Sequence, residues 1–218
     1  MNDTRIYQIK EKLIKLSAAD IEHKIFGATE YAKIDHGHHY KLLPTVTQYE
    51  IEQFESKRQV SLPDEYKTFL TCMSGGGAGP YYGLYTMEKG VKEAQEYSTE
   101  DSKGIENPLS IDFPFSNSET QKFINYYNAC IEEGDDDEIV YPEIPDELTG
   151  VIFLSEYGCG WSYLLVVKGE QAGTVWFHGE YMCPVFFKGK QCGFFDWYEQ
   201  WLDNSLKELG HSTAKAEP

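Results

Sequence analysis

The segment LPTVTQYEIEQFESKRQVSLPDEYKTFLTCMSGGGAGPYYGLY, residues 43–85, carries the clearest structural signals in this chain. Thr47 and Glu50 have the spacing of a capping box, in which a hydroxyl and a carboxylate satisfy backbone N–H groups at the start of a helix. The tetrapeptide LPDE at residues 62–65 predicts the start of a second helix, because proline needs no N–H partner in a first turn and acids favour the positive end of the helix dipole. The aromatic run at residues 81–85 predicts a short strand after these two helices.

The second half of the chain predicts an antiparallel sheet. Residues 151–157 and 161–167 are apolar and aromatic stretches on either side of a Gly-Cys-Gly turn, which is typical of a hairpin, and residues 173–178 predict a third strand. Further helices are expected at residues 4–16, near residues 91–97, after the capping pair Ser116 and Glu119, and at residues 194–209, where Gly210 would be the C-cap. Helices, then neighbouring strands, then a closing helix form the order of an α+β fold, not of alternating β-α-β units.

We therefore predict one domain at residues 41–210, with a mostly antiparallel sheet and helices packed against it. Residues 1–40 would be a helical N-terminal extension and residues 211–218 a disordered tail. A chain of 218 residues with 41% hydrophobic and 15% aromatic residues can form such a core. It has no apolar stretch near the ~18–20 residues of a membrane span and no apolar signal-peptide region, and its five cysteines form no CxxC pair. These features favour a cytoplasmic protein with reduced thiols.

The formal net charge of −17 is distributed unevenly. Residues 1–40 contain six basic and six acidic side chains, so the excess lies in the remainder of the chain, and residues 123–167 contain ten acids and no Lys or Arg. The densest acidic run is formed by Glu132, Glu133, Asp135, Asp136, Asp137 and Glu138. Such a surface repels nucleic acids and anionic membranes and attracts basic proteins, although an acidic run is also what an ordinary solvated loop looks like.

Aromatic residues concentrate on the predicted strands. Because side chains alternate between the two faces of a strand, some of these aromatics would face away from the core. Exposed Tyr and Trp beside carboxylates are typical of binding hot spots, and the alternative is that all of them pack under the helices. The predicted partner-binding residues are the acidic run together with Glu156, Tyr81, Tyr82, Trp161 and Trp176.

The sequence offers few candidates for catalysis. Cys159, flanked by glycines, could act as a nucleophile with His178 if the two lay on neighbouring strands. A thiolate needs a base or a positive environment, whereas this region lacks Lys and Arg and Glu156 is close in sequence. A structural cysteine in a hairpin turn is the favoured interpretation.

Other candidate sites are also discounted. The glycines at residues 75–77 end a helix and do not open one, so they do not form a phosphate-binding loop. Zinc binding by Cys183 and Cys192 lacks a known ligand spacing. A weak metal site is conceivable at Asp35, His36, His38 and His39, but nothing in the sequence fixes its geometry. No cofactor or metal is therefore expected.

Residues 43–85 are similar to the opening of the SUKH superfamily, which includes the fungal Smi/Knr-type cell-wall regulators. Residues 151–178, VIFLSEYGCGWSYLLVVKGEQAGTVWFH, resemble the second signature of that superfamily. The resemblance covers roughly residues 42–205. Residues 1–40 and the segment 88–149 depart from its minimal domain.

This resemblance implies a single α+β domain without a conserved catalytic residue. Bacterial members are mostly immunity proteins that bind and silence a cognate toxin, very often a nuclease, and fungal members are interaction scaffolds. We therefore expect a non-catalytic protein-binding domain, most concretely an immunity protein that occludes a basic toxin. The alternatives are a scaffold of the Smi/Knr type and a hydrolase dependent on Cys159. The oligomeric state stays open.

Overall fold

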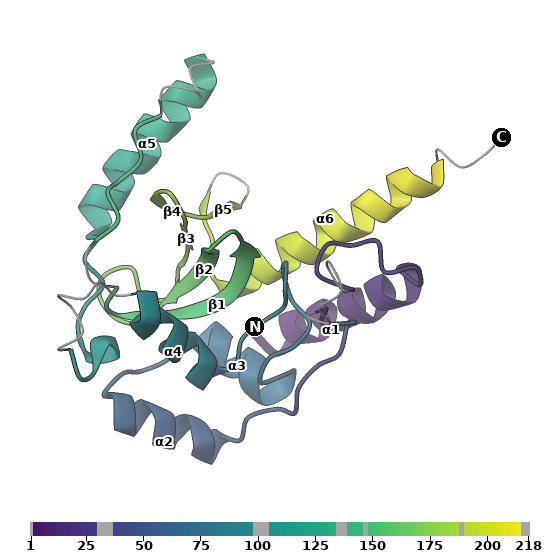
Figure 1. The fold of residues 1–218 in the computed structure, drawn as a ribbon, viewed down its shortest axis with the longest axis horizontal. Coiled ribbons are helices and arrows are strands. Elements are labelled where there is room, and N and C mark those ends of the chain that lie inside the picture. Colours follow the sequence, from purple (N-terminus) through teal and green to yellow (C-terminus); the bar gives the residue numbers. More distant parts are fainter. Residues whose placement is uncertain are drawn as a thin grey trace.

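The computed structural model describes residues 2–29, 37–97, 105–133, 139–145, 148–187 and 190–214. Its helices are α1 (Asn2–Ala19), α2 (Gln48–Arg58), α3 (Asp64–Cys72), α4 (Met87–Tyr97), the 3-10 turn η2 (Pro108–Ser110), α5 (Asn117–Glu133) and α6 (Phe194–Ala214). Its strands are β1 (Val151–Gly158), β2 (Trp161–Val166), β3 (Val175–His178), β4 (Met182–Pro184), β5 (Phe186–Phe187) and β6 (Lys190–Gln191). The order of helices, strands and a closing helix confirms the predicted α+β class (Figure 1).

The main sheet is antiparallel, with the strand order β1-β2-β3-β4, and β5 pairs separately with β6. The predicted hairpin is β1 and β2, in which Ile152 lies opposite Leu165 and Gly158 opposite Trp161. Two register shifts, one between Phe153 and Ser155 and one between Glu156 and Gly158, each displace β1 by one residue relative to β2. Such a bulge changes the face to which the following side chains point.

Both predicted capping boxes form. The Thr47 hydroxyl accepts a hydrogen bond from the Glu50 N–H, and the Glu50 carboxylate accepts one from the Thr47 N–H at 2.7 Å. Ser116 and Glu119 make the same exchange at the start of α5, where the carboxylate accepts from the Ser116 N–H at 2.9 Å. These caps satisfy N–H groups that the first turn of each helix would otherwise leave without partners.

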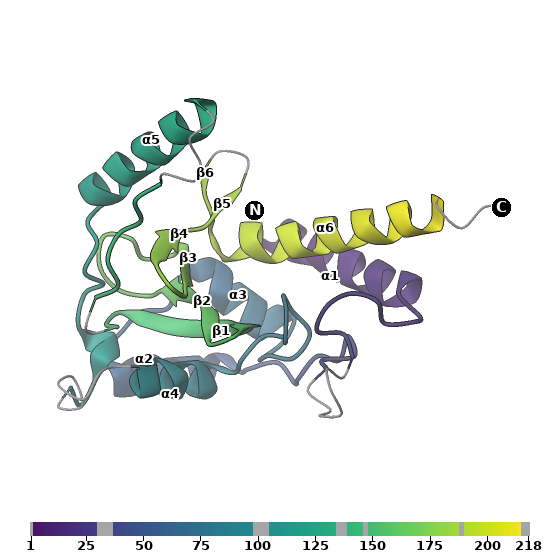
Figure 2. The same ribbon diagram turned by 45° about the horizontal axis from the view of Figure 1, so that its top comes forward.

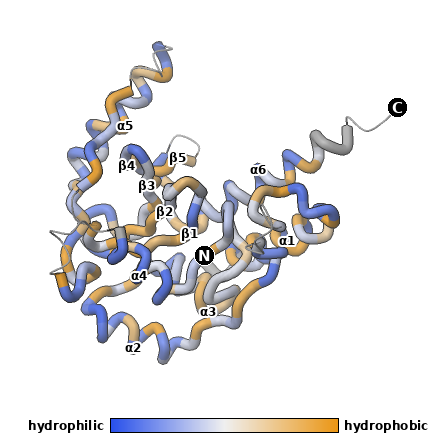
Figure 3. The backbone as a smooth tube through the Cα atoms, viewed as in Figure 1, coloured by the Kyte–Doolittle hydropathy of each residue, from blue (hydrophilic) through white to orange (hydrophobic). Residues whose placement is uncertain are grey.

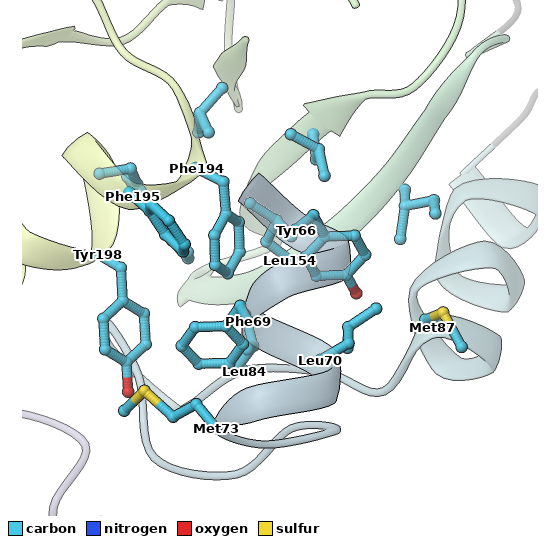
Figure 4. Packing of buried hydrophobic residues seen from close by; sticks show 14 of the residues in the cluster. Tyr66, Phe69, Leu70, Met73, Leu84, Met87, Leu154, Phe194, Phe195 and Tyr198 are labelled. Atoms are coloured by element: carbon cyan, nitrogen blue, oxygen red, sulfur yellow. The ribbon is translucent and has the colours of Figure 1, made fainter. Parts of the chain in front are cut away.

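Apolar side chains cover both faces of the sheet. Ile152 and Leu154 of β1 belong to a large cluster that also contains residues of α1, α2, α3 and α6. Their neighbours Val151 and Phe153 point into a second cluster, together with Trp176 of β3. Figure 4 shows the large cluster, in which aromatic rings from α3 and α6 meet strand and loop residues. The sheet is therefore buried on both sides over most of its length.

The N-terminal helix is part of this core. Ile6, Ile9, Leu13 and Leu16 are buried in the large cluster, and Figure 2 shows α1 running alongside α6 above the sheet, with α2 and α4 below it. Arg5 Nε donates to Glu199 at 2.6 Å, and Lys12 Nζ lies 2.7 Å from Asp203. Hence the residues predicted as an extension pack against the domain through an apolar face and two basic side chains.

Two local predictions are wrong. Residues 81–85 do not form a strand: Tyr81 has a positive φ of 55°, and only an isolated bridge joins Leu84 to Gly77. The segment nevertheless runs beside β1, since the Tyr85 N–H donates to the Leu154 carbonyl at 2.7 Å. Gly210 does not end the last helix, because α6 continues to Ala214.

Helix α5 projects away from the sheet (Figures 1 and 3), and the only residue of it that is fully buried, among those the structure describes, is Thr120. Figure 3 shows hydrophobic and hydrophilic residues alternating along it. Across the described ranges, none of the helices combines the length and apolar character that a bilayer crossing would require.

Candidate functional site

Near the β1–β2 turn, one face of the sheet carries aromatic side chains in place of a covering helix. We call this set the aromatic belt: Phe26, Tyr81, Tyr141, Tyr157, Trp161, Tyr163, Phe177 and Tyr181. All members are half-buried except Phe26, which is 49% exposed. They come from four strand positions, one turn of the sheet and three loop segments that are far apart in sequence.

The rings of the belt contact one another in an unbroken series. Tyr81 stacks on Tyr163 with centroids 5.4 Å apart and lies 4.2 Å from the ring of Tyr157. Phe177 lies edge-on to Trp161 and Tyr163, at 5.7 Å from each. These offset and edge-on arrangements are the ones that aromatic quadrupoles favour, so the belt holds its shape without a partner.

The belt continues towards α5 through a stack of two tyrosines. The rings of Tyr141 and Tyr181 are 3.7 Å apart and nearly parallel, and Tyr141 also contacts Phe123 of α5. Burial and the neighbouring tyrosines raise the pKa of Tyr141 and of Tyr163. Their phenols therefore stay neutral hydrogen-bond donors at any physiological pH.

At its other end the belt opens into a groove of about 410 Å³ between α6 and two loops. Aromatic side chains form most of its walls: Phe26, Tyr81, Tyr163, Trp197 and Trp201. The polar side chains in its lining come from α6, and they are Gln200, Asn204, Ser205 and Glu208. Phe26 and Tyr81 on one wall, and α6 on the other, thus frame a depression that has the size range of small-molecule or side-chain pockets.

The position of Phe26 depends on a close approach of two loops. Gly27 has a φ of +82°, and a Cβ at this position would lie 1.5 Å from the Tyr81 carbonyl oxygen, so only glycine fits. The loop is fixed from its other end by the buried Asp20, whose carboxylate accepts hydrogen bonds from the Lys24 and Ile25 N–H groups and from the Tyr40 hydroxyl. Burial alone would raise the pKa of Asp20, but these hydrogen bonds outweigh it and lower the pKa.

The structure separates the predicted binding residues into different regions. Tyr81 and Trp161 belong to the belt, and Tyr82 lies beside it, since its ring is 5.1 Å from that of Phe26. Glu156 is half-buried on β1 and accepts a hydrogen bond from Tyr85. Glu132 and Glu133 are exposed at the far end of α5, whereas Asp135, Asp136, Asp137 and Glu138 lie outside the described residues.

The assignment of Trp176 to a binding surface was wrong. Only 1% of this side chain is exposed, and its ring packs against Phe113 at 4.9 Å and Phe115 at 5.1 Å. Its indole N–H donates to the Thr174 hydroxyl, which satisfies the only polar atom of the side chain. Because the sheet is covered on this face, alternation along β3 directs Trp176 into the second core cluster.

Sequence inspection missed several members of the site. Phe26, Tyr141, Tyr157 and Tyr181 lie in loops or at strand ends, where no periodic pattern marks an exposed face. The groove residues of α6 were predicted only as part of a closing helix at residues 194–209. Gln200, Asn204 and Glu208 recur at intervals of four, which places them on a shared helix face but does not indicate what lies opposite it.

The candidate catalytic pair occupies a turn and a core position. Cys159 is exposed in the β1–β2 turn, and His178 is a buried residue of β3 whose ring is 5.8 Å from Phe153. Burial lowers the pKa of His178. Burial also raises the pKa of Cys183 and Cys192 to about 12, which disfavours the thiolates that zinc requires.

Metal ligands do not gather anywhere in the described ranges: no three His, Cys, Asp or Glu residues there are placed to hold an ion. Asp35 and His36 of the proposed histidine cluster lie outside those ranges. His38 is buried against Tyr40 and Trp201, and its Nδ1 accepts a hydrogen bond from the Tyr40 N–H at 3.0 Å.

A second groove lies on another side of the molecule, between α2 and α4. Its volume is about 790 Å³, and its lining includes the exposed side chains of Leu43 and Tyr49. It also contains Lys57, Glu50 and Glu88, so it combines both charges. This groove is the principal competitor to the aromatic belt as a docking surface.

The fold and the site together define a small α+β domain that carries a preformed aromatic surface. The model of the SMI1 / KNR4 family (SUKH-1) matches residues 45–200, so the chain belongs to this family. The family is generally non-catalytic. Comparisons with curated proteins and with solved structures gave no significant match.

Proposed function

We propose that this chain is a protein-binding domain of the immunity type, which neutralises a basic toxin by docking the aromatic belt over the toxin's functional surface. The observation that carries the proposal is the belt itself, a connected set of half-buried rings on a sheet face that is covered elsewhere. Large preorganised aromatics are the residues that contribute most to binding energy at interfaces.

The rigidity of the belt favours a protein partner. Each ring already contacts at least one other ring, as in the series Tyr157, Trp161 and Phe177. Ordering these side chains on binding therefore costs little additional entropy, which is the main cost that preorganised interfaces avoid. Their phenol and indole groups can also donate hydrogen bonds at the rim of an otherwise apolar contact.

The charge of the chain favours a basic partner. The net charge is −17, with 36 acidic side chains against 19 Lys and Arg. A negative field of this kind increases the rate of encounter with a Lys- and Arg-rich protein and opposes nucleic acids. For a nuclease toxin, occlusion of the basic substrate cleft would be sufficient for inhibition without any chemistry.

The test is a binding measurement with the product of an adjacent toxin-like reading frame. Trp161→Ala and Phe26→Ala should each weaken the complex by about 30-fold, the loss expected from a hot spot of about 2 kcal/mol. Tyr49→Ala is the matched control, since Tyr49 is an aromatic residue that is 69% exposed but lies at the α2–α4 groove. Circular dichroism of each variant establishes that the fold is retained.

The outcomes separate the alternatives. If Tyr49→Ala abolishes binding while Trp161→Ala and Phe26→Ala have no effect, the belt is not the interface. If a partner binds through the belt but keeps its toxicity, or is a regulatory protein, the chain acts as a scaffold of the Smi/Knr type. A Cys159→Ala variant that loses protection while still binding its partner would favour the hydrolase hypothesis.

A further inference from the structure

The groove at the end of the aromatic belt has an aromatic side and a polar side, whereas the rest of the belt is aromatic throughout. Its floor is formed by Trp197, which is 3% exposed, and by Tyr163, whose ring lies 5.6 Å from that of Trp197. Phe26 and Tyr81 form one wall, with their ring centroids 6.2 Å apart. A side chain that enters this groove would therefore meet aromatic surface on several sides.

The polar side of the groove is formed by α6, whose Gln200, Asn204, Ser205 and Glu208 side chains each offer a hydrogen-bond acceptor, while the two amides and the hydroxyl are donors as well. Trp201, Ser205 and Glu208 follow one another along α6 at helical spacing, and Gln200 and Asn204 form the adjacent row. Glu208 is exposed and carries the single formal charge in the lining that the structure describes. Lys24, which is close in sequence to Phe26, pairs with Glu22 at 2.7 Å instead.

From this arrangement we propose that the groove binds the guanidinium group of an arginine side chain presented by the partner protein. The proposal rests on the protein-binding function above and names the group that the partner inserts. The guanidinium plane would lie against the aromatic walls and donate hydrogen bonds to the carboxylate of Glu208 and the amide oxygens beside it.

The chemistry of the lining selects this group over others. A carboxylate beside aromatic faces repels anions, and a purely apolar side chain would cover part of the polar α6 side of the groove without making a hydrogen bond to it. A guanidinium suits both sides of the groove, because it stacks on aromatic rings and donates several N–H groups in a fixed plane to the polar side. The ammonium of lysine is more strongly hydrated and stacks less well, so arginine should bind more tightly. The volume of about 410 Å³ suits one long side chain better than a helix.

The proposal can be tested without the partner, using the full chain and small probes. The probes are N-acetyl-arginine methylamide, the matching lysine compound and the neutral citrulline compound, each titrated to about 50 mM at low salt. Two-dimensional NMR would follow the indole N–H signals of Trp197 and Trp201. We expect arginine to shift these signals with a dissociation constant in the millimolar range, as weak single-group binding predicts.

Two variants provide the controls. Glu208→Gln should weaken arginine binding by about fivefold to tenfold, the difference between a charge-assisted and a neutral hydrogen bond. Glu180→Gln removes an exposed acid of the β3–β4 turn that does not line the groove, so it should change the dissociation constant by less than twofold.

Three results would overturn the proposal: no shift with arginine, an equal response to citrulline, or an equal response to lysine. Equal losses in the Glu208 and Glu180 variants would also overturn it, because binding would then follow net charge alone. Failure of this inference is distinguishable from failure of the proposed function. If the Trp161 and Phe26 variants lose the partner while arginine does not bind, the belt is the interface and only the arginine assignment is wrong.

Discussion

The N-terminal helix provides the sharpest test of how the domain is built. Ile9 of α1 is fully buried between α1 and the rest of the large core cluster, whereas Ile14 on the same helix is 63% exposed. Replacement of each by alanine makes the same chemical change in the same helix. The difference between the two variants therefore isolates the burial of α1 against the domain.

The magnitude follows from the exposure of the two residues. Removing a fully buried isoleucine side chain costs about 2–5 kcal/mol, which combines the lost transfer free energy with the cavity left behind. Exposed substitutions away from special features change stability by roughly 0.5 kcal/mol or less. Since domains of this kind have about 5–15 kcal/mol in total, Ile9→Ala should remove a large part of the free energy of unfolding.

The assay is urea unfolding of both variants, followed by circular dichroism and by tryptophan fluorescence. Because the four tryptophans lie outside α1, coincident transitions would show that the helix and the sheet unfold together. A loss in the free energy of unfolding for Ile9→Ala no larger than that for Ile14→Ala would show that α1 is not part of the core. So would an early transition seen only by circular dichroism, because it would identify α1 as a separate extension.

Two other predictions concern the loops that support the groove. Gly27→Ala should destabilise the protein and weaken partner binding, because a Cβ there would lie 1.5 Å from the Tyr81 carbonyl oxygen at a φ of +82°. Gly210→Ala is the control, since no atom lies within 4 Å of the added Cβ, and it should stabilise α6 by about 0.5–1 kcal/mol. Urea unfolding measures the stability of both variants, and equal changes in their free energies of unfolding would contradict the close contact between Gly27 and Tyr81. Burial lowers the pKa of His38 from 6.5 to about 4, so its contribution to stability is fully present above pH 6.5 and declines by about 1.4 kcal/mol per pH unit as the pH falls towards 4. A His38→Gln variant should lose this part of the pH dependence in unfolding curves between pH 6.5 and 4, and an unchanged slope would show that other groups cause it.

Local chemistry made part of the fold predictable. The pairs Thr47–Glu50 and Ser116–Glu119 fix helix starts through contacts within four residues, so sequence alone contains the required information. The β1–β2 hairpin is likewise local. By contrast, β4, β5 and β6 contain only two or three residues each, which is too short for a periodic pattern.

The wrong sequence predictions concern residues whose positions are set by tertiary contacts. Trp176 was assigned to a surface because alternation marks two faces, but it does not reveal that helices and loops cover both of them. Tyr81 and Tyr82 have high strand propensity, yet the close approach of Gly27 to Tyr81 places them in a turn. The groove depends on the meeting of residues 25–26 with α6, which are more than 150 positions apart, and no local pattern can report such a contact.

The proposed docking of a partner protein on the aromatic belt can be measured by hydrogen–deuterium exchange. The exchange of the full chain is compared with and without the product of the adjacent toxin-like reading frame. If the belt is the interface, binding slows exchange at the β1–β2 turn, at the β3–β4 turn around Tyr181 and in the loop at Tyr81, with no change in α2. Protection confined to α2, α4 and residues 43–46 would contradict it, because the partner would then occupy the second groove.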